Sequence, residues 1–444
     1  MSKHKDKLAC IITYGCQMNE HDSEKLAGVL EGEGYKATKE LEKADIIILN
    51  TCCVRENAEL KVYGKVGQLK RLKEENPDLI IGICGCMMQQ DEVVKEIKEK
   101  YRHVDIVFGT HNIHHFPELL QKAKEDKNPL VRVWDESKEL IPDMPVQRTD
   151  DYRAWVTIIY GCNNFCTYCI VPYVRGREKS RPLENIVGEI KGLVEDGVKE
   201  ITLLGQNVNS YGNDFEDGTD FADLLAAINE VEGLARIRFM TSHPKDCSDR
   251  LIEAVAKLDK VCPHFHLPVQ AGSNNVLKAM NRGYTREEYL ELVSKIRESN
   301  PEASIGTDVI VGFPGETEED FQDTLDLFKK VKYDMTYNFI YSKRTGTPAA
   351  KKEDQVSEEE KKERLQRLID LQKNISMENN QKYLGETVEV LVEGESKNNP
   401  DRLTGRTDTN KIVIFESDED LTGELVDVKI DKVQSWTLYG NLVD

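Results

Sequence analysis

Apolar runs alternate with amphipathic stretches along the first part of the chain. The runs "LACIITYGC", "ADIIILNTCCV", "DLIIGICGC" and "VDIVFGT" are mainly aliphatic, and helical periodicity at 22–33, 55–75 and 90–100 separates them. Continuous aliphatic strands are typical of parallel sheets that helices cover on both faces. The pattern therefore predicts a doubly wound α/β domain over residues 1–134. The charged, aperiodic stretch 135–151 is interpreted as a linker between folding units.

A second series of strand-like runs occupies residues 152–375. Its six runs are "WVTIIYGC", "EITLLGQNV", "RIRFMTSHP", "HFHLPVQAGS", "IGTDVIVGFPG" and "YNFIYSKRTGTP", and helical patterns at 183–195, 220–230, 285–298 and 317–331 separate several of them. Repeated strand–helix units predict an incomplete TIM-type barrel, a partial (βα)6 fold. Reactive groups in such a barrel lie at the C-terminal ends of its strands.

The last part of the chain changes its pattern twice. Residues 353–383 show leucines and isoleucine at helical spacing among charges, which predicts a long solvated helix that acts as a connector. Residues 381–444 then show short alternating strands separated by Gly, Asn and Asp turns. This pattern predicts a small antiparallel β-barrel as the C-terminal domain.

Composition narrows the setting of this α/β protein. No eighteen apolar residues occur together and the N-terminal apolar run is short, so we expect neither a membrane span nor a signal peptide and place the protein in the cytoplasm. In that reducing compartment the 11 cysteines are more often free thiols or metal ligands than disulfides. The net charge of -20 argues against a protein that coats nucleic acid non-specifically, although it leaves room for a local basic site.

Three cysteines stand together in "YGCNNFCTYCIV", which directly follows an apolar run. Cys162, Cys166 and Cys169 form a C-x3-C-x2-C array. Thiolates select zinc or iron–sulfur clusters, and a 4Fe-4S cluster held by three of them keeps one iron open. An open iron can chelate S-adenosylmethionine (SAM) and pass it an electron that cleaves the sulfonium bond to a radical. The alternatives are a zinc knuckle without a clear fourth ligand, or three unrelated core cysteines.

A second trio is spread over the N-terminal domain. Cys16, Cys52 and Cys86 each close an apolar run, and the carboxyl ends of parallel strands converge on one crevice of a doubly wound sheet. The sequence therefore predicts a second cluster site with three thiolates, and buried core cysteines are the alternative. We expect the other candidate ligands to be core, bystander or surface residues: Cys10, Cys53, Cys84, Cys247, Cys262, His111, His114 and His115.

The two trios, together with "YGCQMNEHDSE", "LNTCCVRENAE", "VPYVRGREKSRP", "HLPVQAGSN" and "SWTLYGNLV", make the chain resemble the methylthiotransferases nearly end to end. These are radical-SAM enzymes with an N-terminal cluster domain, a central partial barrel and a C-terminal TRAM domain. The stretch "GCQMNEHDSE" is similar to the branch that acts on tRNA bearing N6-isopentenyladenosine. The branch for threonylcarbamoyl-adenosine usually carries "GCKVN", and the ribosomal-protein branch carries "GCPKN".

The resemblance implies a reaction and its partners. Cys162, Cys166 and Cys169 would hold the SAM-cleaving 4Fe-4S cluster, and Cys16, Cys52 and Cys86 the auxiliary 4Fe-4S cluster that presents sulfur. Two SAM molecules per turnover would place a 2-methylthio group on C2 of N6-isopentenyladenosine next to the tRNA anticodon. Flavodoxin or ferredoxin would donate electrons, and a separate source would supply sulfur. The alternatives are the same chemistry on threonylcarbamoyl-adenosine tRNA, or an iron–sulfur RNA-binding protein without catalysis.

The SAM contacts depart from the usual pattern. Many radical-SAM enzymes carry a Gly-Gly-Glu-like motif after the second barrel strand, where this chain has Gly205, Gln206 and Asn207. We expect Gln206 and Asn207 to contact SAM by hydrogen bonds without charge, with Ser242 and Gln270 at later strand ends as further candidates. Helix capping is the alternative for the last two.

Two local basic groups are candidates for RNA contacts. The first follows the cysteine array and contains Arg175, Arg177, Lys179 and Arg181; a solvated loop is the alternative. The C-terminal domain from residue 382 has 7 Lys and Arg against 14 Asp and Glu, so binding there requires a local face. The candidates for this face are Arg402, Arg406, Lys411, Trp436 and Tyr439.

Overall fold

A computed structural model describes residues 7–53, 56–125, 129–134, 144–397 and 399–443. The part of the linker at 135–143 lies outside this range. The chain divides into two compact units. The first contains Met1–Asp150, Tyr160–Asn163 and Cys169–Arg181, and the second contains Asp151–Ile159, Asn164–Tyr168 and Pro182–Asp444.

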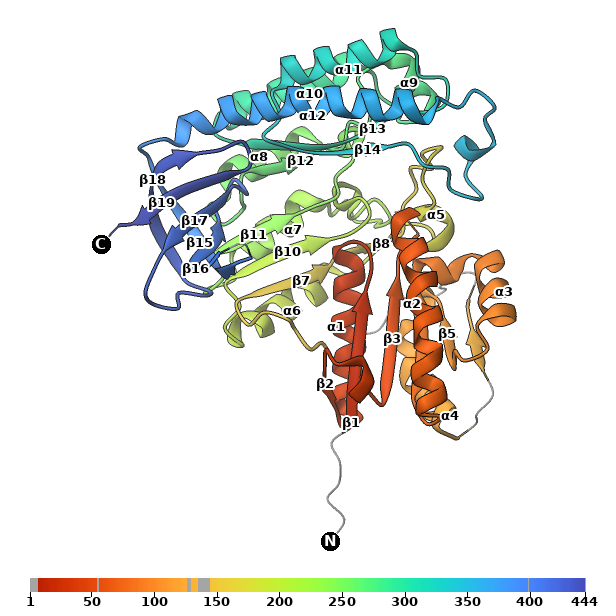
Figure 1. Cartoon of the computed structure of the whole chain (residues 1–444). Helices are drawn as coiled ribbons and strands as arrows, with labels where there is room; N and C mark the ends of the chain where they lie inside the picture. The colour runs from red at the N-terminus through yellow and green to blue at the C-terminus, as the bar shows by residue number, and fades with distance from the viewer. Residues whose placement is uncertain (1–6, 54–55, 126–128, 135–143, 398, 444) are drawn as a thin grey trace. The chain divides into compact units, whose positions relative to one another are not determined.

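The first unit is built on a six-stranded parallel sheet in the order β2-β1-β3-β4-β5-β6 (Figure 1). Its strands are β1 (Lys7–Thr13), β2 (Tyr35–Ala37), β3 (Ile46–Thr51), β4 (Ile80–Gly85), β5 (Ile106–Phe108) and β6 (Leu130–Arg132). Its helices are α1 (Gln17–Gly32), α2 (Glu56–Glu75), α3 (Asp91–Lys100), α4 (Phe116–Glu125) and the short α5 (Val171–Val174). Short 3-10 turns occupy Leu41–Lys43, Cys86–Gln89 and Thr110–His115.

Both faces of this sheet are buried, as the aliphatic runs predict. Leu26 and Val29 of α1 pack with Phe116 of α4 against one face of the sheet. Val62 of α2 and Ile97 of α3 pack against the other face. The doubly wound domain is therefore confirmed, but α1 begins at Gln17, five residues earlier than the periodicity indicated.

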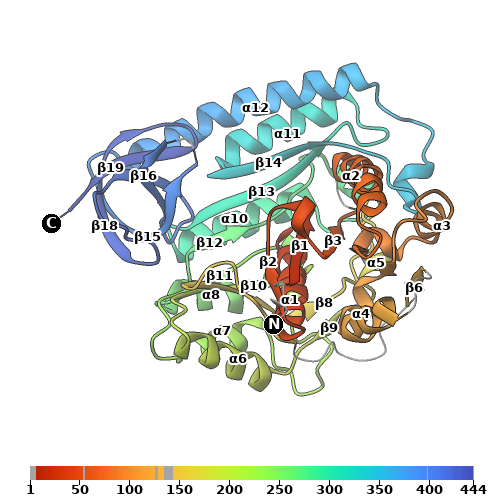
Figure 2. The ribbon, with the colours of Figure 1, turned by 60° about the horizontal axis from the view of Figure 1, so that its bottom comes forward.

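Six parallel strands of the second unit form the predicted partial barrel. Two three-stranded sheets, β11-β10-β7 and β12-β13-β14, are joined by a parallel bridge between Ile237 and Val261 (Figure 2). The strands are β7 (Arg153–Thr157), β10 (Glu200–Leu204), β11 (Arg236–Phe239), β12 (His264–His266), β13 (Ser304–Val311) and β14 (Met335–Ile340). The helices are α6 (Leu183–Glu195), α7 (Phe221–Asn229), α8 (Asp249–Lys257), α9 (Asn274–Ala279), α10 (Arg286–Ser299) and α11 (Glu318–Val331). A short ribbon pairs β8 (Ile159–Tyr160) with β9 (Lys179–Ser180).

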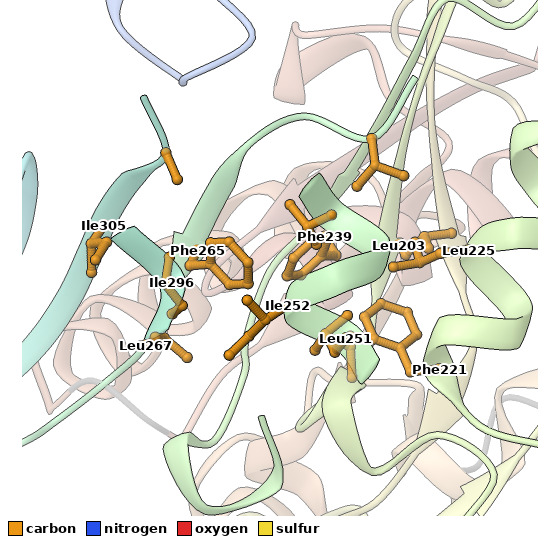
Figure 3. Packing of buried hydrophobic residues seen from close by; sticks show 14 of the residues in the cluster. Leu203, Phe221, Leu225, Phe239, Leu251, Ile252, Phe265, Leu267, Ile296 and Ile305 are labelled. Carbon is orange, nitrogen blue, oxygen red and sulfur yellow. The ribbon is translucent and has the colours of Figure 1, made fainter. Parts of the chain in front are cut away.

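The barrel core lies between the strands and their covering helices. Phe239 of β11 stands edge-on to Phe221 of α7 and to Phe265 of β12, with ring centroids 5.4 and 6.0 Å apart (Figure 3). Ile252 of α8 and Ile296 of α10 fill the space beside these rings. This packing fixes the positions of the strand ends, where the candidate site residues follow.

The long helix α12 (Glu358–Asn380) covers the barrel and is more than a connector. It runs beside α11 and β14 in Figures 1 and 2. Leu368 and Ile375 are buried in the barrel core, and Gln372 donates a hydrogen bond to the carbonyl of Tyr333 at 2.9 Å. The expectation of a solvated helix is wrong for this face because its apolar residues complete the core beside the last strand.

The C-terminal strands close into a barrel in the order β15-β16-β17-β19-β18. They are β15 (Thr387–Ser396), β16 (Asn399–Arg406), β17 (Ile412–Glu416), β18 (Leu425–Val433) and β19 (Thr437–Leu442). All neighbouring strands are antiparallel except the parallel pair β17 and β19. The small barrel is attached to the start of β11, where Arg238 donates hydrogen bonds to the carbonyls of Thr407 and Asp408 at 2.8 and 3.0 Å.

Candidate functional site

The N-terminal trio lies at the carboxyl edge of the parallel sheet. Cys16, Cys52 and Cys86 directly follow or nearly follow β1, β3 and β4, which are neighbours in the sheet. Residues separated by more than thirty positions in the sequence thus come to one sheet edge, because β1 and β3 pair in parallel, as do β3 and β4. This is the position at which doubly wound sheets bind their ligands.

Glycine backbones turn two of these cysteines into place. Gly15 has a φ of +127°, and a Cβ there would lie 2.6 Å from Cβ of Cys52. Gly85 has a φ of +97°, and a Cβ there would lie 2.3 Å from the carbonyl oxygen of Thr51. L-residues with a side chain rarely adopt such conformations. The Gly-Cys pairs at 15–16 and 85–86 therefore allow strand ends to approach each other at the trio.

A polar network surrounds the trio. Oδ1 of Asn19, in the first turn of α1, lies 3.7 Å from Sγ of Cys16 and 4.0 Å from Sγ of Cys86. The Asn19 amide nitrogen donates to the carbonyls of Tyr14 and Thr51 at 3.0 and 2.9 Å, which holds it between two strand ends. Asn19 is thus a residue of this site that the cysteine pattern alone did not indicate.

Arg175 reaches the same site from the C-terminal end of α5. Its Nε donates to Sγ of Cys86 at 3.2 Å, and one terminal nitrogen contacts Asn19 Oδ1 at 3.1 Å and Asp22 Oδ2 at 3.0 Å. Arg175 is 8% exposed, and its guanidinium is committed to these partners. Its assignment as an RNA contact is therefore wrong: the buried charge faces a thiol and a carboxylate.

Cys53 lies beyond the end of β3, so strand alternation does not orient it away from the site. Its thiol hydrogen-bonds to Cys86, and this bond, assisted by Arg175, lowers the pKa of Cys86 to about 6. Donating that bond, together with burial, raises the pKa of Cys53 well above its usual value. The hydrogen bond and Arg175 therefore favour the charged form of Cys86, and the same bond and burial favour the neutral form of Cys53.

The residues present fit an iron–sulfur cluster. Within the described ranges no three His, Cys, Asp or Glu side chains converge as the ligands of a single metal ion would. Thiolates bound to separate irons of one cluster lie farther apart than ligands of one ion. Three thiol ligands, a nearby guanidinium and amide groups match the thiolate ligation and hydrogen-bonded surroundings of such clusters.

The C-x3-C-x2-C array makes hydrogen bonds within each of the two units. The Cys162 amide donates to the carbonyl of Gly176 at 3.1 Å within the first unit. In the second unit, the Thr167 amide donates to the carbonyl of Met280 at 3.0 Å. Asn281 donates to the carbonyl of Phe165 at 3.1 Å, and Phe165 has a φ of +48°. These bonds hold Cys162 within the first unit and the segment around Cys166 within the second.

A second buried arginine contacts this array. Nη1 of Arg282 lies 3.4 Å from Sγ of Cys166 and 3.4 Å from the hydroxyl of Tyr168. Its Nη2 donates to the carbonyl of Pro268 at 2.5 Å and its Nε to the hydroxyl of Tyr284 at 3.1 Å. No motif in the sequence indicates Arg282, which is separated from the array by more than a hundred residues.

Unpaired polar groups gather at the strand ends of the barrel. Ser242 Oγ, Gln270 Oε1 and both amide atoms of Asn209 are buried without a hydrogen-bond partner among the described residues. Buried polar atoms usually have partners, so these groups fit a polar ligand such as SAM. Asn209 was not among the expected contacts.

Asn207 has a structural role beside the SAM contact that the sequence predicts. Its amide nitrogen donates to Asp246 Oδ2 at 2.7 Å, and its oxygen accepts from the amide of His243 at 3.0 Å. These two bonds hold the loop after β11, and the contact of Asn207 with SAM stays a prediction. Gln206 is half-buried, and its contact with SAM stays a prediction.

Several expected RNA contacts are occupied within the protein. Arg181 is 8% exposed, and Lys411 is buried in an ion pair with Asp334 at 2.9 Å. Arg406 donates to Glu393 at 3.0 Å. Arg181 and Lys411 are thus buried and Arg406 is half-buried, and their contacts with RNA stay a prediction.

Other expected groups remain available on the surface. Arg402 is half-buried and paired with Glu416 at 2.7 Å. Trp436 is 50% exposed, and Tyr439 lies under the ammonium of Lys432. Arg177 is also exposed. These residues are compatible with an RNA face, which stays a prediction.

The remaining cysteines and histidines behave mostly as expected. Cys10 and Cys84 are buried in the cores on opposite faces of the sheet. Cys262 is also buried. His111 is 5% exposed, so its interpretation as a surface residue is wrong, whereas His115 is half-buried and stands edge-on to Trp134.

Comparison with known sequences identifies the family. The model of the radical SAM superfamily matches residues 156–328, that of the uncharacterized protein family UPF0004 matches 8–109, and that of the TRAM domain matches 381–443. A tRNA-2-methylthio-N6-dimethylallyladenosine synthase of Acetivibrio thermocellus is 59% identical over 439 residues, covering 99% of this chain and 92% of the relative. The chain belongs to the tRNA-2-methylthio-N6-dimethylallyladenosine synthase family.

Further members show the same likeness over the full chain. The synthase of Alkaliphilus oremlandii is 58% identical and covers 100% of this chain and 94% of the relative. That of Desulforamulus reducens is 59% identical and covers 99% and 96%. The family is thus one of radical-SAM enzymes with a TRAM domain, and the expected alternatives, a threonylcarbamoyl-adenosine enzyme and a binder without catalysis, are not favoured.

Solved structures support the fold. The radical SAM methyltransferase TsrM from Kitasatospora setae, with cobalamin and a [4Fe-4S] cluster bound, has a TM-score of 0.56 and 14% identity, covering 78% of this chain and 77% of TsrM. The cobalamin-dependent radical enzyme OxsB has a TM-score of 0.52, covering 73% and 52%. No helix within the described residues has the length and apolar character that crossing a membrane requires.

Proposed function

We propose that the chain adds a 2-methylthio group to C2 of N6-isopentenyladenosine, also called N6-dimethylallyladenosine, in tRNA. Each turnover would consume two SAM molecules. The observation that carries the proposal is identity of 58–59% along nearly the whole chain to synthases named for this product. Two separate sets of three cysteines, one at the edge of a parallel sheet and one in an anchored loop, fit the two 4Fe-4S clusters of this family.

The cluster ligands divide between two tasks. Cys162, Cys166 and Cys169 would hold the cluster that binds SAM, and Cys16, Cys52 and Cys86 the auxiliary one. When bound, the first cluster and SAM supply a radical that removes hydrogen from adenine C2, and the auxiliary cluster supplies sulfur.

This chain's own polar groups would position SAM. Asn209, Ser242 and Gln270 offer it buried hydrogen-bonding atoms that have no protein partner within the described ranges. We further assign residues 1–134 to the auxiliary-cluster domain, 152–375 to the radical-SAM core and 381–444 to the TRAM domain.

We further propose that the target base lies in the anticodon loop. A base in a loop leaves its stack at a lower energetic cost than a paired base, and the reacting carbon must reach a buried site. The reduction step requires an electron donor such as flavodoxin or ferredoxin, and repeated turnover requires a sulfur source. With tRNA as the substrate, we propose that the reaction takes place in the cytoplasm.

Mass spectrometry of tRNA nucleosides tests the substrate. A strain that lacks this protein is expected to lose the 2-methylthio derivative of N6-isopentenyladenosine and to accumulate the unmethylthiolated base. Loss of the 2-methylthio derivative of threonylcarbamoyl-adenosine, with that of N6-isopentenyladenosine unchanged, would refute the proposal.

The paired cysteines provide a test of the ligand assignment. C52S is expected to lose the auxiliary cluster, measured as iron and sulfide after anaerobic reconstitution, while C53S retains it. C53S is the matched control because the two thiols are adjacent and equally buried, each with 1% exposure. The reverse result would assign the third ligand to Cys53.

A further inference from the structure

Each cysteine trio has a fully buried arginine in contact with one of its thiols. Arg175 lies 3.2 Å from Cys86 within the first unit, and Arg282 lies 3.4 Å from Cys166 within the second. The two arginines are 8% and 4% exposed. A guanidinium loses several kcal/mol of hydration on burial. A buried positive charge therefore indicates an anion beside it.

The anion differs between the two sites. Arg175 has a carboxylate partner, Asp22, at 3.0 Å, and both side chains are buried. Arg282 contacts a thiol, the carbonyl of Pro268 and the hydroxyls of Tyr168 and Tyr284, and within the described part of the chain none of these partners is a carboxylate. Cys166 is thus the contact through which a bound cluster, with its thiolate ligands, would supply the compensating negative charge.

Both arginines are held in place by structure around them. Arg175 follows α5, whose last residue, Val174, accepts a hydrogen bond from Thr110 at 2.8 Å. Arg282 stands in the turn after α9, and Met280 and Asn281 of this turn bond to the array loop. The guanidinium groups are therefore fixed against their thiols before any ligand binds.

We propose that Arg175 and Arg282 are positioning residues that act as separate counter-charges to the two clusters and set their reduction potentials independently. The inference rests on the proposed cluster ligands. A fixed positive charge beside a ligating sulfur stabilises the added electron of the reduced cluster, so it raises the potential. Asp22 opposes this effect for the N-terminal cluster, because its carboxylate partly cancels the charge of Arg175.

The test is a redox titration followed by EPR spectroscopy, in full-length chains that load one cluster at a time. Replacing Cys16, Cys52 and Cys86 by alanine isolates the barrel cluster, and replacing Cys162, Cys166 and Cys169 isolates the N-terminal cluster. R282Q is expected to lower the potential of the barrel cluster, and R175Q that of the N-terminal cluster. Loss of one close charge should change the reduction equilibrium roughly tenfold, which is about 59 mV for one electron.

Three further variants separate electrostatics from structure. R175K and R282K keep the charge and are expected to restore most of the wild-type potential. D22N keeps Arg175 and is expected to raise the potential of the N-terminal cluster, opposite to R175Q. R286Q is the matched control, because Arg286 is buried, pairs with Asp323 and Asp326, and contacts no cysteine in the described structure.

Three outcomes would overturn the inference. The first is an unchanged reduction potential in R175Q and R282Q, and the second is a shift in D22N that has the same sign as the shift in R175Q. The third is an equal shift of both clusters in either arginine variant. Failure of a trio to load any cluster in the otherwise wild-type chain would instead overturn the cluster assignment. A cluster that loads normally but keeps its potential refutes the counter-charge role alone. The two failures are therefore distinguishable in one set of samples.

Discussion

Substituting Gly85 by alanine should remove the auxiliary cluster and leave the barrel cluster intact. Gly85 ends β4 with φ of 97° and ψ of -169°, a region that residues with a side chain essentially do not occupy. Its added Cβ would lie 2.3 Å from the carbonyl oxygen of Thr51 and 2.6 Å from Oδ1 of Asn50. Both neighbours belong to β3, which leads to Cys52. The chain must shift at the place where Cys86 and Cys52 approach each other.

The magnitude follows from these two effects. A residue forced into such a backbone conformation costs about 1–3 kcal/mol, and an overpacked contact costs about 1–3 kcal/mol more. The sum of about 2–6 kcal/mol is comparable to the stability of a whole domain. We therefore expect G85A either to unfold the sheet edge locally or to displace Cys86 from its cluster position.

The assay is iron and sulfide content after anaerobic reconstitution, combined with product analysis. G85A is expected to hold half of the wild-type iron and to form 5′-deoxyadenosine from SAM without the methylthio product. G64A is the control, since Gly64 lies inside α2 with nothing within 4 Å of an added Cβ. Alanine there should stabilise the helix by up to about 1 kcal/mol. Full iron content and wild-type melting temperature in G85A would refute the reasoning.

Three further outcomes are expected. Burial lowers the pKa of His21 and His264 well below the ordinary value, so both side chains stay neutral in the folded protein. In the unfolded chain each histidine takes up a proton below about pH 6.5. The free energy of unfolding therefore falls by up to about 1.4 kcal/mol per histidine for each pH unit below that value. Urea unfolding of the apoprotein that is equally stable at pH 7.5 and 5.5 would contradict this. R238M leaves Glu200 buried without its partner at 2.7 Å and removes two hydrogen bonds to the TRAM domain. It should lower the free energy of unfolding by about 3–5 kcal/mol and make the TRAM domain sensitive to limited proteolysis. Resistance equal to that of the wild type would argue that Arg238 does not anchor this domain. W436A should weaken tRNA binding by about 1–3 kcal/mol without changing the melting temperature, because the indole is half exposed; an unchanged Kd would exclude a stacking role.

The fold follows from patterns that are local in the sequence. Aliphatic runs and amphipathic periods predict the two α/β units and the small C-terminal barrel. A strand that is buried on both faces is continuously apolar, whereas a strand that is buried on one face alternates between apolar and polar residues. The sequence predicts α12 as a solvated connector because its charged residues outnumber its apolar ones. A few of the apolar residues, among them Leu368 and Ile375, nevertheless reach the core. Counting charges along a helix does not reveal what packs against its narrow apolar face.

The sequence predicts site residues only where they have a characteristic spacing or directly follow predicted strands. The cysteine trios meet that condition. Arg282 does not, because its contact with Cys166 is made by tertiary structure, and Arg175 gave the wrong prediction because a basic motif carries no sign of burial. The structural role of Asn207 is likewise not visible in the sequence, because its bonds to Asp246 and the His243 amide are made by tertiary structure.

The most direct measurement is a single-turnover reaction of the anaerobically reconstituted chain with SAM, a reductant and tRNA that bears N6-isopentenyladenosine. The account predicts 5′-deoxyadenosine and a 2-methylthio product, with loss of the methylthio product alone when Cys16, Cys52 and Cys86 are replaced by alanine. Formation of the methylthio product by this variant, or absence of 5′-deoxyadenosine from the fully loaded wild-type chain, would contradict it.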